Sequence, residues 1–134
     1  MKFVIRAGGI GTRLWPYSRK GRPKQFHAMA GQDTMIQGAV ERIAAISARE
    51  DVYVSTGQEM AGLVREQLPQ ISAEQVIIEP ALRNTGPAVG LAYALLEARF
   101  LGCAVASLCS DHALVKGVAS CPWLPLSATA QARY

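Results

Sequence analysis

The chain has 134 residues, about the size of a single domain; half of them are apolar and 18% are charged, with a net charge of +4. This composition favours a packed globular core over disorder, and no apolar run approaches the roughly 20 residues of a membrane-spanning helix, so we expect no membrane partner. Arg6 interrupts the first apolar run too early for a secretory signal, and the three cysteines form no CxxC pair. We therefore expect a cytoplasmic protein with reduced thiols.

The positive charge is concentrated near the N-terminus. Residues 1–32 carry seven basic and no acidic residues, whereas residues 33–134 carry seven basic and ten acidic residues. A local basic region of this kind suits a small polyanion such as a nucleotide. Nucleic acid is disfavoured as a partner, because no aromatic residues alternate with the basic ones and no nucleic-acid motif is present.

Short apolar runs alternate with helical patterns along the chain. The runs that predict strands are residues 3–5, 51–55, 76–78 and 103–108. The patterns that predict helices are residues 34–46, 58–68 and 87–100. Strands of continuous apolar residues joined by helices predict an α/β fold with a doubly wound, mostly parallel sheet that is covered on both faces.

The segment between the first strand and the first helix, residues 7–33, is long and rich in glycine, which indicates a function. It begins with Ala-Gly-Gly-Ile-Gly-Thr-Arg-Leu-Trp-Pro at residues 7–16. Glycines let a backbone approach a phosphate closely, and Arg13 and Lys24 add charged donors. The string is neither a Walker A loop nor the dinucleotide fingerprint, since no Gly-Lys-Ser/Thr ends it and Leu14 replaces the third glycine. The alternative to phosphate binding is that this segment is only a glycine-rich turn with solvated arginines.

Ligands bind beyond the carboxyl ends of the strands in such a sheet, and this rule selects polar residues in two further loops. Asn84 and Thr85 precede the third helix, where they either cap it or face the base or ribose of a nucleotide. Asp111 follows the fourth strand and is placed to hold Mg²⁺, which prefers one or two carboxylates together with phosphate oxygens. The alternative for Asp111 is a helix cap or a turn.

The string at residues 7–16 resembles the sugar-nucleotide pyrophosphorylase signature, GGxGTRLxP. Further motifs are similar, in order and spacing, to those of the mannose-1-phosphate guanylyltransferase branch. They are Trp15 with Ser18-Arg19, Pro23-Lys24-Gln25-Phe26, Glu79-Pro80, Arg83-Asn84-Thr85 and Ser110-Asp111-His112. The resemblance implies a Rossmann-like nucleotidyltransferase sheet, truncated relative to the family. Residues 1–114 would be the N-terminal nucleotide-binding part of that domain, and residues 115–134 an irregular tail that departs from the family pattern.

The resemblance also implies a reaction, in which GTP and mannose 1-phosphate give GDP-mannose and pyrophosphate with Mg²⁺ as cofactor. By family match, the catalytic residues are Arg13 and Lys24, which would steady the phosphates, and Asp111, which would hold the metal. The residues that would bind the nucleotide are Gly8, Gly9, Gly11, Thr12, Arg13, Lys24, Glu79, Asn84 and Thr85. The alternatives are a non-catalytic nucleotide-binding fragment and a pyrophosphorylase for another sugar nucleotide, and the oligomeric state stays open, a homo-oligomer included.

The chain also departs from the family pattern. Arg6 stands where the family has an apolar residue at the end of the first strand, and an unpaired arginine is costly to bury. The family's sugar-phosphate pocket and second metal-binding carboxylate have no matching motif in the chain. We therefore expect the chain, assayed alone, to be inactive or weakly active.

Overall fold

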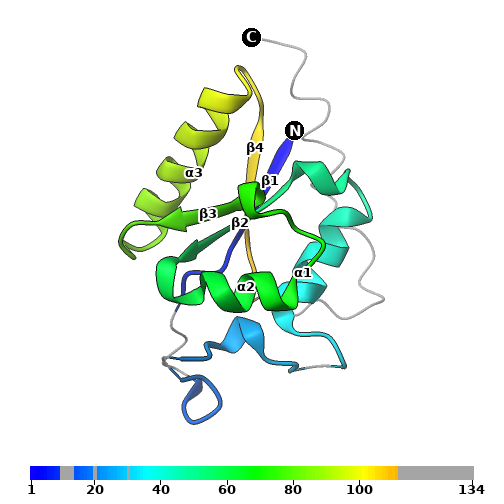
Figure 1. The fold of residues 1–134 in the computed structure, drawn as a ribbon, viewed down its shortest axis with the longest axis vertical. Coiled ribbons are helices and arrows are strands. Elements are labelled where there is room, and N and C mark those ends of the chain that lie inside the picture. Colours follow the sequence, from blue (N-terminus) through cyan, green and yellow to red (C-terminus); the bar gives the residue numbers. More distant parts are fainter. Residues whose placement is uncertain (10–13, 20, 30, 112–134) are drawn as a thin grey trace.

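The computed structural model describes residues 1–9, 14–19, 21–29 and 31–111, and Figure 1 shows their arrangement. The predictions for Gly11, Thr12 and Arg13, and for the tail at residues 115–134, lie outside the described residues.

The centre of the fold is a sheet of four parallel strands. The strands are β1 (Lys2–Arg6), β2 (Val52–Gly57), β3 (Val76–Glu79) and β4 (Val105–Cys109). Their order is β3-β2-β1-β4, and all three pairings between neighbours are parallel. The predicted parallel α/β sheet is therefore confirmed, with the N-terminal strand near its middle.

Helices cover both faces of this sheet (Figure 1). They are α1 (Met35–Ala44), α2 (Ala61–Gln67) and α3 (Thr85–Arg99). One core cluster joins apolar residues of α1 and α2 to Ile5 and Val54 of the sheet, and a second joins α3 to Val4 and Tyr53. Because successive residues of β1 and β2 enter opposite clusters, both strands are buried on both faces, as the apolar runs predict.

The element ends differ from the predicted ones where tertiary contacts decide them. Asp51 precedes β2 in a short 3₁₀ turn, where it accepts a hydrogen bond from Lys2. Cys103 precedes β4 because a turn at Gly102, with φ of 73°, brings the amide of Cys103 to the carbonyl of Phe100. Helix α3 begins at Thr85, two residues before the predicted start at Pro87.

Polar residues at the end of β2 are buried without a loss of hydrogen bonds. The hydroxyl of Ser55 donates to the Glu79 carboxylate at 2.7 Å, and that of Thr56 donates to the carbonyl of Ala7 at 3.2 Å. These bonds satisfy groups that would otherwise be costly to bury. They also fix the carboxyl ends of β1, β2 and β3 relative to one another.

Within the described residues, no helix combines the length and the hydropathy that crossing a bilayer requires.

Candidate functional site

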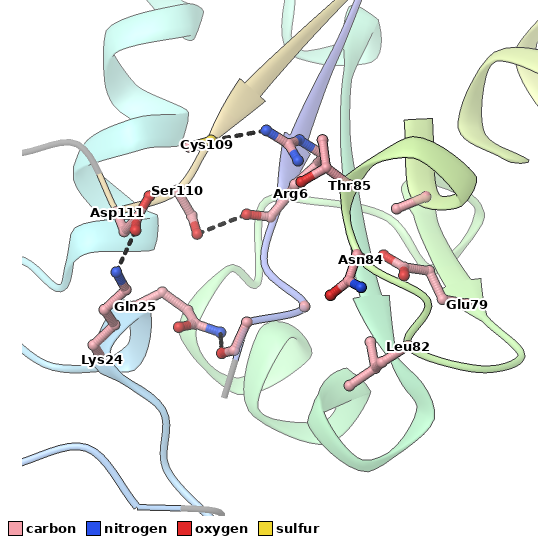
Figure 2. A pocket seen from close by; sticks show the side chains of 13 residues that line it. Arg6, Lys24, Gln25, Glu79, Leu82, Asn84, Thr85, Cys109, Ser110 and Asp111 are labelled. Carbon is pink, nitrogen blue, oxygen red and sulfur yellow. Dashed lines mark hydrogen bonds and ion pairs between the residues drawn. The ribbon is translucent and has the colours of Figure 1, made fainter. Parts of the chain in front are cut away.

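A cavity of about 420 Å³ lies at the carboxyl ends of the strands (Figure 2). Its lining comes from the loop after β1, the short helix at Lys24–Phe26, the loop before α3 and the end of β4. The structure thus brings together most of the residues that the sequence predicts for one site. Those that line the cavity are Gly8, Gly9, Lys24, Glu79, Asn84, Thr85 and Asp111.

Gln25 holds the glycine loop in place. Its amide nitrogen donates to the carbonyl of Ala7 at 2.9 Å and to that of Gly9 at 3.0 Å, and the residue is 2% exposed. Phe26, fully buried beside it, anchors this short helix in the core. Sequence reasoning missed the role of Gln25, although the residue stands inside the Pro23–Phe26 motif.

The backbone of Gly8 lies close to the side chains of Leu82 and Glu79. A Cβ at Gly8 would lie 3.2 Å from Cδ2 of Leu82 and 3.4 Å from Oε1 of Glu79. A Cβ at Gly57 would lie 3.3 Å from the same Leu82 atom. Leu82 therefore rests on two glycine backbones, and the sequence carried no signal for this contact.

Glu79 is a buried carboxylate in the wall of the cavity, and it is only 6% exposed. Oε1 accepts the bond from Ser55, and within the described part of the chain no hydrogen bond reaches Oε2. A second cavity of about 320 Å³ shares Glu79 and Leu82 with the first. Glu79 therefore offers a carboxylate oxygen to a ligand at the junction of the two cavities.

Lys24 and Asp111 form an ion pair in this cavity (Figure 2). Both side chains are partly exposed, at 29% and 28%. The described residues contain no group of three or more His, Cys, Asp or Glu side chains that could hold a metal ion. A single carboxylate fits a Mg²⁺ ion that is shared with phosphate oxygens and water, and it does not fit a closed protein cage.

Asn84 adopts a backbone conformation that side chains rarely take, with φ of 63° and ψ of −169°. It occupies the N-cap position of α3, but its side chain makes no capping hydrogen bond. The capping alternative for Asn84 is therefore wrong, and Thr85 is the first residue of the helix rather than its cap. Strained residues of this kind gather at ligand sites, at a cost of about 1–3 kcal/mol each.

Arg6 also lines the cavity, which the sequence did not predict. It pairs with Cys109 across β1 and β4, and its Nη2 donates to Cys109 Sγ at 2.8 Å. The hydroxyl of Ser110 donates to the carbonyl of Arg6 at 2.8 Å. The cost of an arginine at the end of β1 is thus reduced by a thiol partner and by access to the cavity.

The family model described as nucleotidyl transferase matches residues 2–120. The chain belongs to the nucleotidyl transferase family. It is 45% identical over 91 residues to mannose-1-phosphate guanylyltransferase RfbM of Salmonella typhimurium, a match that covers 66% of this chain and 19% of that protein. It is 38% identical over 113 residues to the alginate biosynthesis protein AlgA of Pseudomonas aeruginosa, covering 83% of this chain and 23% of that protein.

A crystal structure from Thermus thermophilus, described as a mannose-1-phosphate geranyltransferase, has the same fold. The TM-score is 0.71 at 30% identity, and the match covers 84% of this chain and 32% of that chain. The chain therefore spans about a fifth of the length of the curated relatives it matches and about a third of the Thermus thermophilus chain. The resemblance to mannose-1-phosphate guanylyltransferases is confirmed, while the expected boundary between residues 114 and 115 stays a prediction.

Proposed function

We propose that the chain is the nucleotide-binding part of a mannose-1-phosphate guanylyltransferase, which joins GTP and mannose 1-phosphate into GDP-mannose and releases pyrophosphate. One observation carries the proposal: seven residues predicted from separate motifs line one cavity at the carboxyl ends of a parallel sheet. This edge is where nucleotides bind in doubly wound folds. The names of the relatives give the proposal its substrates. Such a reaction fits a cytoplasmic location, which stays a prediction.

The phosphates would lie over the glycine loop. Backbone amides at Gly8 and Gly9 are close to the cavity, and Lys24 supplies a cation beside them. Arg13, outside the described residues, would add a fork of donors by family match. Gln25 supports this assignment, because its two hydrogen bonds fix the carbonyls of the loop and leave the loop amides in a set position.

The base would lie near Glu79, in the part of the cavity that Leu82, Asn84 and Thr85 border. Guanine presents two adjacent donors, N1–H and the N2 amino group, to which a carboxylate is complementary. Adenine presents one donor and one acceptor there, and so repels a carboxylate oxygen. The buried Glu79 therefore favours guanine over adenine as the base.

The reaction is a displacement at phosphorus. A phosphate oxygen of the sugar attacks the α-phosphorus of GTP, the bond to the β-phosphate oxygen breaks, and pyrophosphate leaves with its electron pair. Negative charge is redistributed over phosphoryl oxygens, so the residues of the chain contribute mainly position and electrostatic stabilisation. Lys24 would leave Asp111 and contact a phosphate oxygen, and Asp111 would turn to the metal. Mg²⁺, when bound, would neutralise phosphate charge.

We expect the 134-residue chain, assayed alone, to bind GTP and to release little pyrophosphate, because its sequence has no match to the family's motifs for the sugar-phosphate pocket. This is the second candidate, nucleotide binding without turnover. A pyrophosphate-release assay with GTP, Mg²⁺ and mannose 1-phosphate distinguishes an active guanylyltransferase from a fragment that binds the nucleotide without turnover. Rapid release supports the enzyme, and binding without release supports the fragment.

The proposed substrates are tested by competition against a fluorescent GTP analogue. GDP-mannose should displace the analogue at lower concentration than ADP-glucose or UDP-glucose. Stronger displacement by either of those two nucleotide sugars would assign the chain to another pyrophosphorylase.

A further inference from the structure

The charged side chains that line the main cavity differ in the kind of partner that each one has. Lys24 is bound to Asp111, and Glu79 accepts a hydrogen bond from Ser55. Arg6 has a thiol for a partner and forms no ion pair with any described carboxylate. The guanidinium of an arginine carries a positive charge. The cavity wall therefore holds a guanidinium that makes no direct ion pair with a described acidic side chain, although Glu79 lines the same cavity.

Much of the hydrogen-bonding capacity of Arg6 is also unused. A guanidinium carries five N–H donors in a planar fork. Nη2 donates to Cys109, while Nε is buried and has no partner among the described residues. The bond to Cys109 and the pairing of the two strands keep the guanidinium on the wall of the cavity, as Figure 2 shows. A held, charged donor with spare hydrogens is suited to an acceptor oxygen of a ligand.

We propose that Arg6 is a nucleotide-binding residue whose guanidinium donates hydrogen bonds to an acceptor oxygen of the bound nucleotide. This inference rests on the proposed nucleotide site, and it adds a residue that the sequence motifs do not contain. Two parts of a nucleotide offer such oxygens, the phosphates and O6 of guanine. Both are ordinary arginine ligands.

Cys109 then acts as a positioning residue. Its sulfur holds one end of the guanidinium, and the neighbouring Ser110 hydroxyl holds the Arg6 carbonyl. Neither contact brings Arg6 the negative charge that Asp111 brings to Lys24. The guanidinium is thus held in one direction, and none of these contacts pairs it with a carboxylate.

The test compares Arg6→Leu with Arg65→Leu in titrations of the whole chain with GTP and with guanosine. Arg65 is an exposed residue of α2 outside both cavities, so its loss changes the net charge equally. Loss of a charge-assisted hydrogen bond should weaken GTP binding about 10- to 100-fold in Arg6→Leu. Arg65→Leu should stay within about twofold, since long-range charge is screened.

The guanosine arm identifies the oxygen. A loss for GTP alone supports a phosphate contact, and an equal loss for guanosine supports a contact to the base. Unchanged binding of both ligands would overturn the proposal.

Arg6→Lys, which keeps the charge and loses the fork, is the second variant. It should bind GTP with intermediate affinity, and it decides the question if Arg6→Leu fails to fold. Wild-type affinity in a folded Arg6→Lys would contradict the proposed fork. Failure of the wild-type chain to bind GTP would instead refute the nucleotide site itself.

Discussion

The ammonium of Lys24 and the carboxylate of Asp111 are paired with each other, although the proposed reaction needs each for a different part of the ligand. Lys24 comes from the segment after the glycine loop, and Asp111 follows β4. In this ion pair the positive charge of Lys24 and the negative charge of Asp111 compensate each other. In the proposed function, phosphates of the nucleotide would replace Asp111 as the partner of Lys24, and Asp111 would then be available to hold Mg²⁺.

Asp111→Asn should therefore have opposite effects on two binding constants. Without Mg²⁺, GTP should bind more tightly, since Lys24 is released and a negative charge near the phosphates is gone. With Mg²⁺, the gain in affinity that the wild-type chain shows should disappear, because a neutral amide is a poor ligand for a hard cation. Titrations with GTP at a series of Mg²⁺ concentrations measure both effects.

The control for Asp111→Asn is Asp33→Asn, which removes an equal charge from an exposed position outside the cavities. It should leave both constants near wild type. If Asp111→Asn kept the full Mg²⁺ enhancement, the metal role of this carboxylate would be wrong.

Glu79→Gln should change the choice of base. A glutamine side chain offers one acceptor and one donor, which matches adenine and mismatches the two adjacent donors of guanine. GTP affinity should fall about tenfold or more, and ATP affinity should rise. Parallel titrations with GTP and ATP measure the ratio. Glu66→Gln, on the exposed side of α2, is the matched control, and an unaltered GTP-to-ATP ratio in Glu79→Gln would rule out base recognition by Glu79.

Gly57→Ala should act through Leu82. The new methyl group would lie 3.3–3.6 Å from three Leu82 carbons, so this half-exposed side chain must shift between the two cavities. The free energy of unfolding should fall by less than about 1 kcal/mol, because an exposed side chain can move where a core one cannot. In a Leu82→Ala background the same substitution should cost less or become stabilising, because alanine adopts the φ of −77° at Gly57 without strain. Urea unfolding of the four proteins gives this comparison, and an equal cost in both backgrounds would refute the contact.

The pair of Lys2 and Asp51 predicts a pH dependence of stability away from the cavity. Nζ of Lys2 donates to Oδ1 of Asp51 at 2.5 Å, and this hydrogen bond raises the pKa of Lys2 above its ordinary value of 10.5. A raised pKa in the folded state means that the stabilisation is complete below the unfolded pKa and is lost as the pH rises through the folded one. The contribution should thus be constant at neutral pH, begin to fall above the ordinary pKa of 10.5, and be lost as the pH passes the raised pKa of the folded state.

Asp51→Asn should lower the free energy of unfolding at pH 7 by about 1 kcal/mol, as expected for a partly exposed pair. The difference from wild type should be smaller at about pH 11, which lies above the ordinary lysine pKa of 10.5. Urea unfolding at the two pH values measures it, with the exposed Glu50→Gln as the control. A difference that stays the same at both pH values would show that the ion pair does not cause it.

The order of the elements could be predicted because apolar runs and helical patterns are local properties of the sequence. The tertiary contacts that set the ends of these strands and helices could not be predicted from the sequence. Asp51 lies before β2, where it accepts a hydrogen bond from Lys2, and Cys103 lies before β4, next to the turn at Gly102. Both effects depend on residues that the fold alone brings close together.

The candidate site divides in the same way. Gly8, Glu79 and Asp111 were predicted from motifs and from the rule that ligands bind at the carboxyl ends of parallel strands. The position of Arg6 opposite Cys109 follows from the register of β1 and β4, which the sequence does not state. The contact of Leu82 with Gly57 likewise joins the loop after β3 to the end of β2, and the sheet sets the spacing of these two segments.

The central claim is that the cavity at the carboxyl ends of the strands binds a guanine nucleotide. Isothermal titration calorimetry of the 134-residue chain with GTP and Mg²⁺ tests it most directly. We expect saturable binding of one GTP per chain that is stronger than binding of ATP and weakens as salt is added, because cations contribute to it. The claim would be contradicted if the chain is folded by circular dichroism but gives no binding heat with GTP at any salt concentration. In that case GTP should also fail to displace a fluorescent GTP analogue.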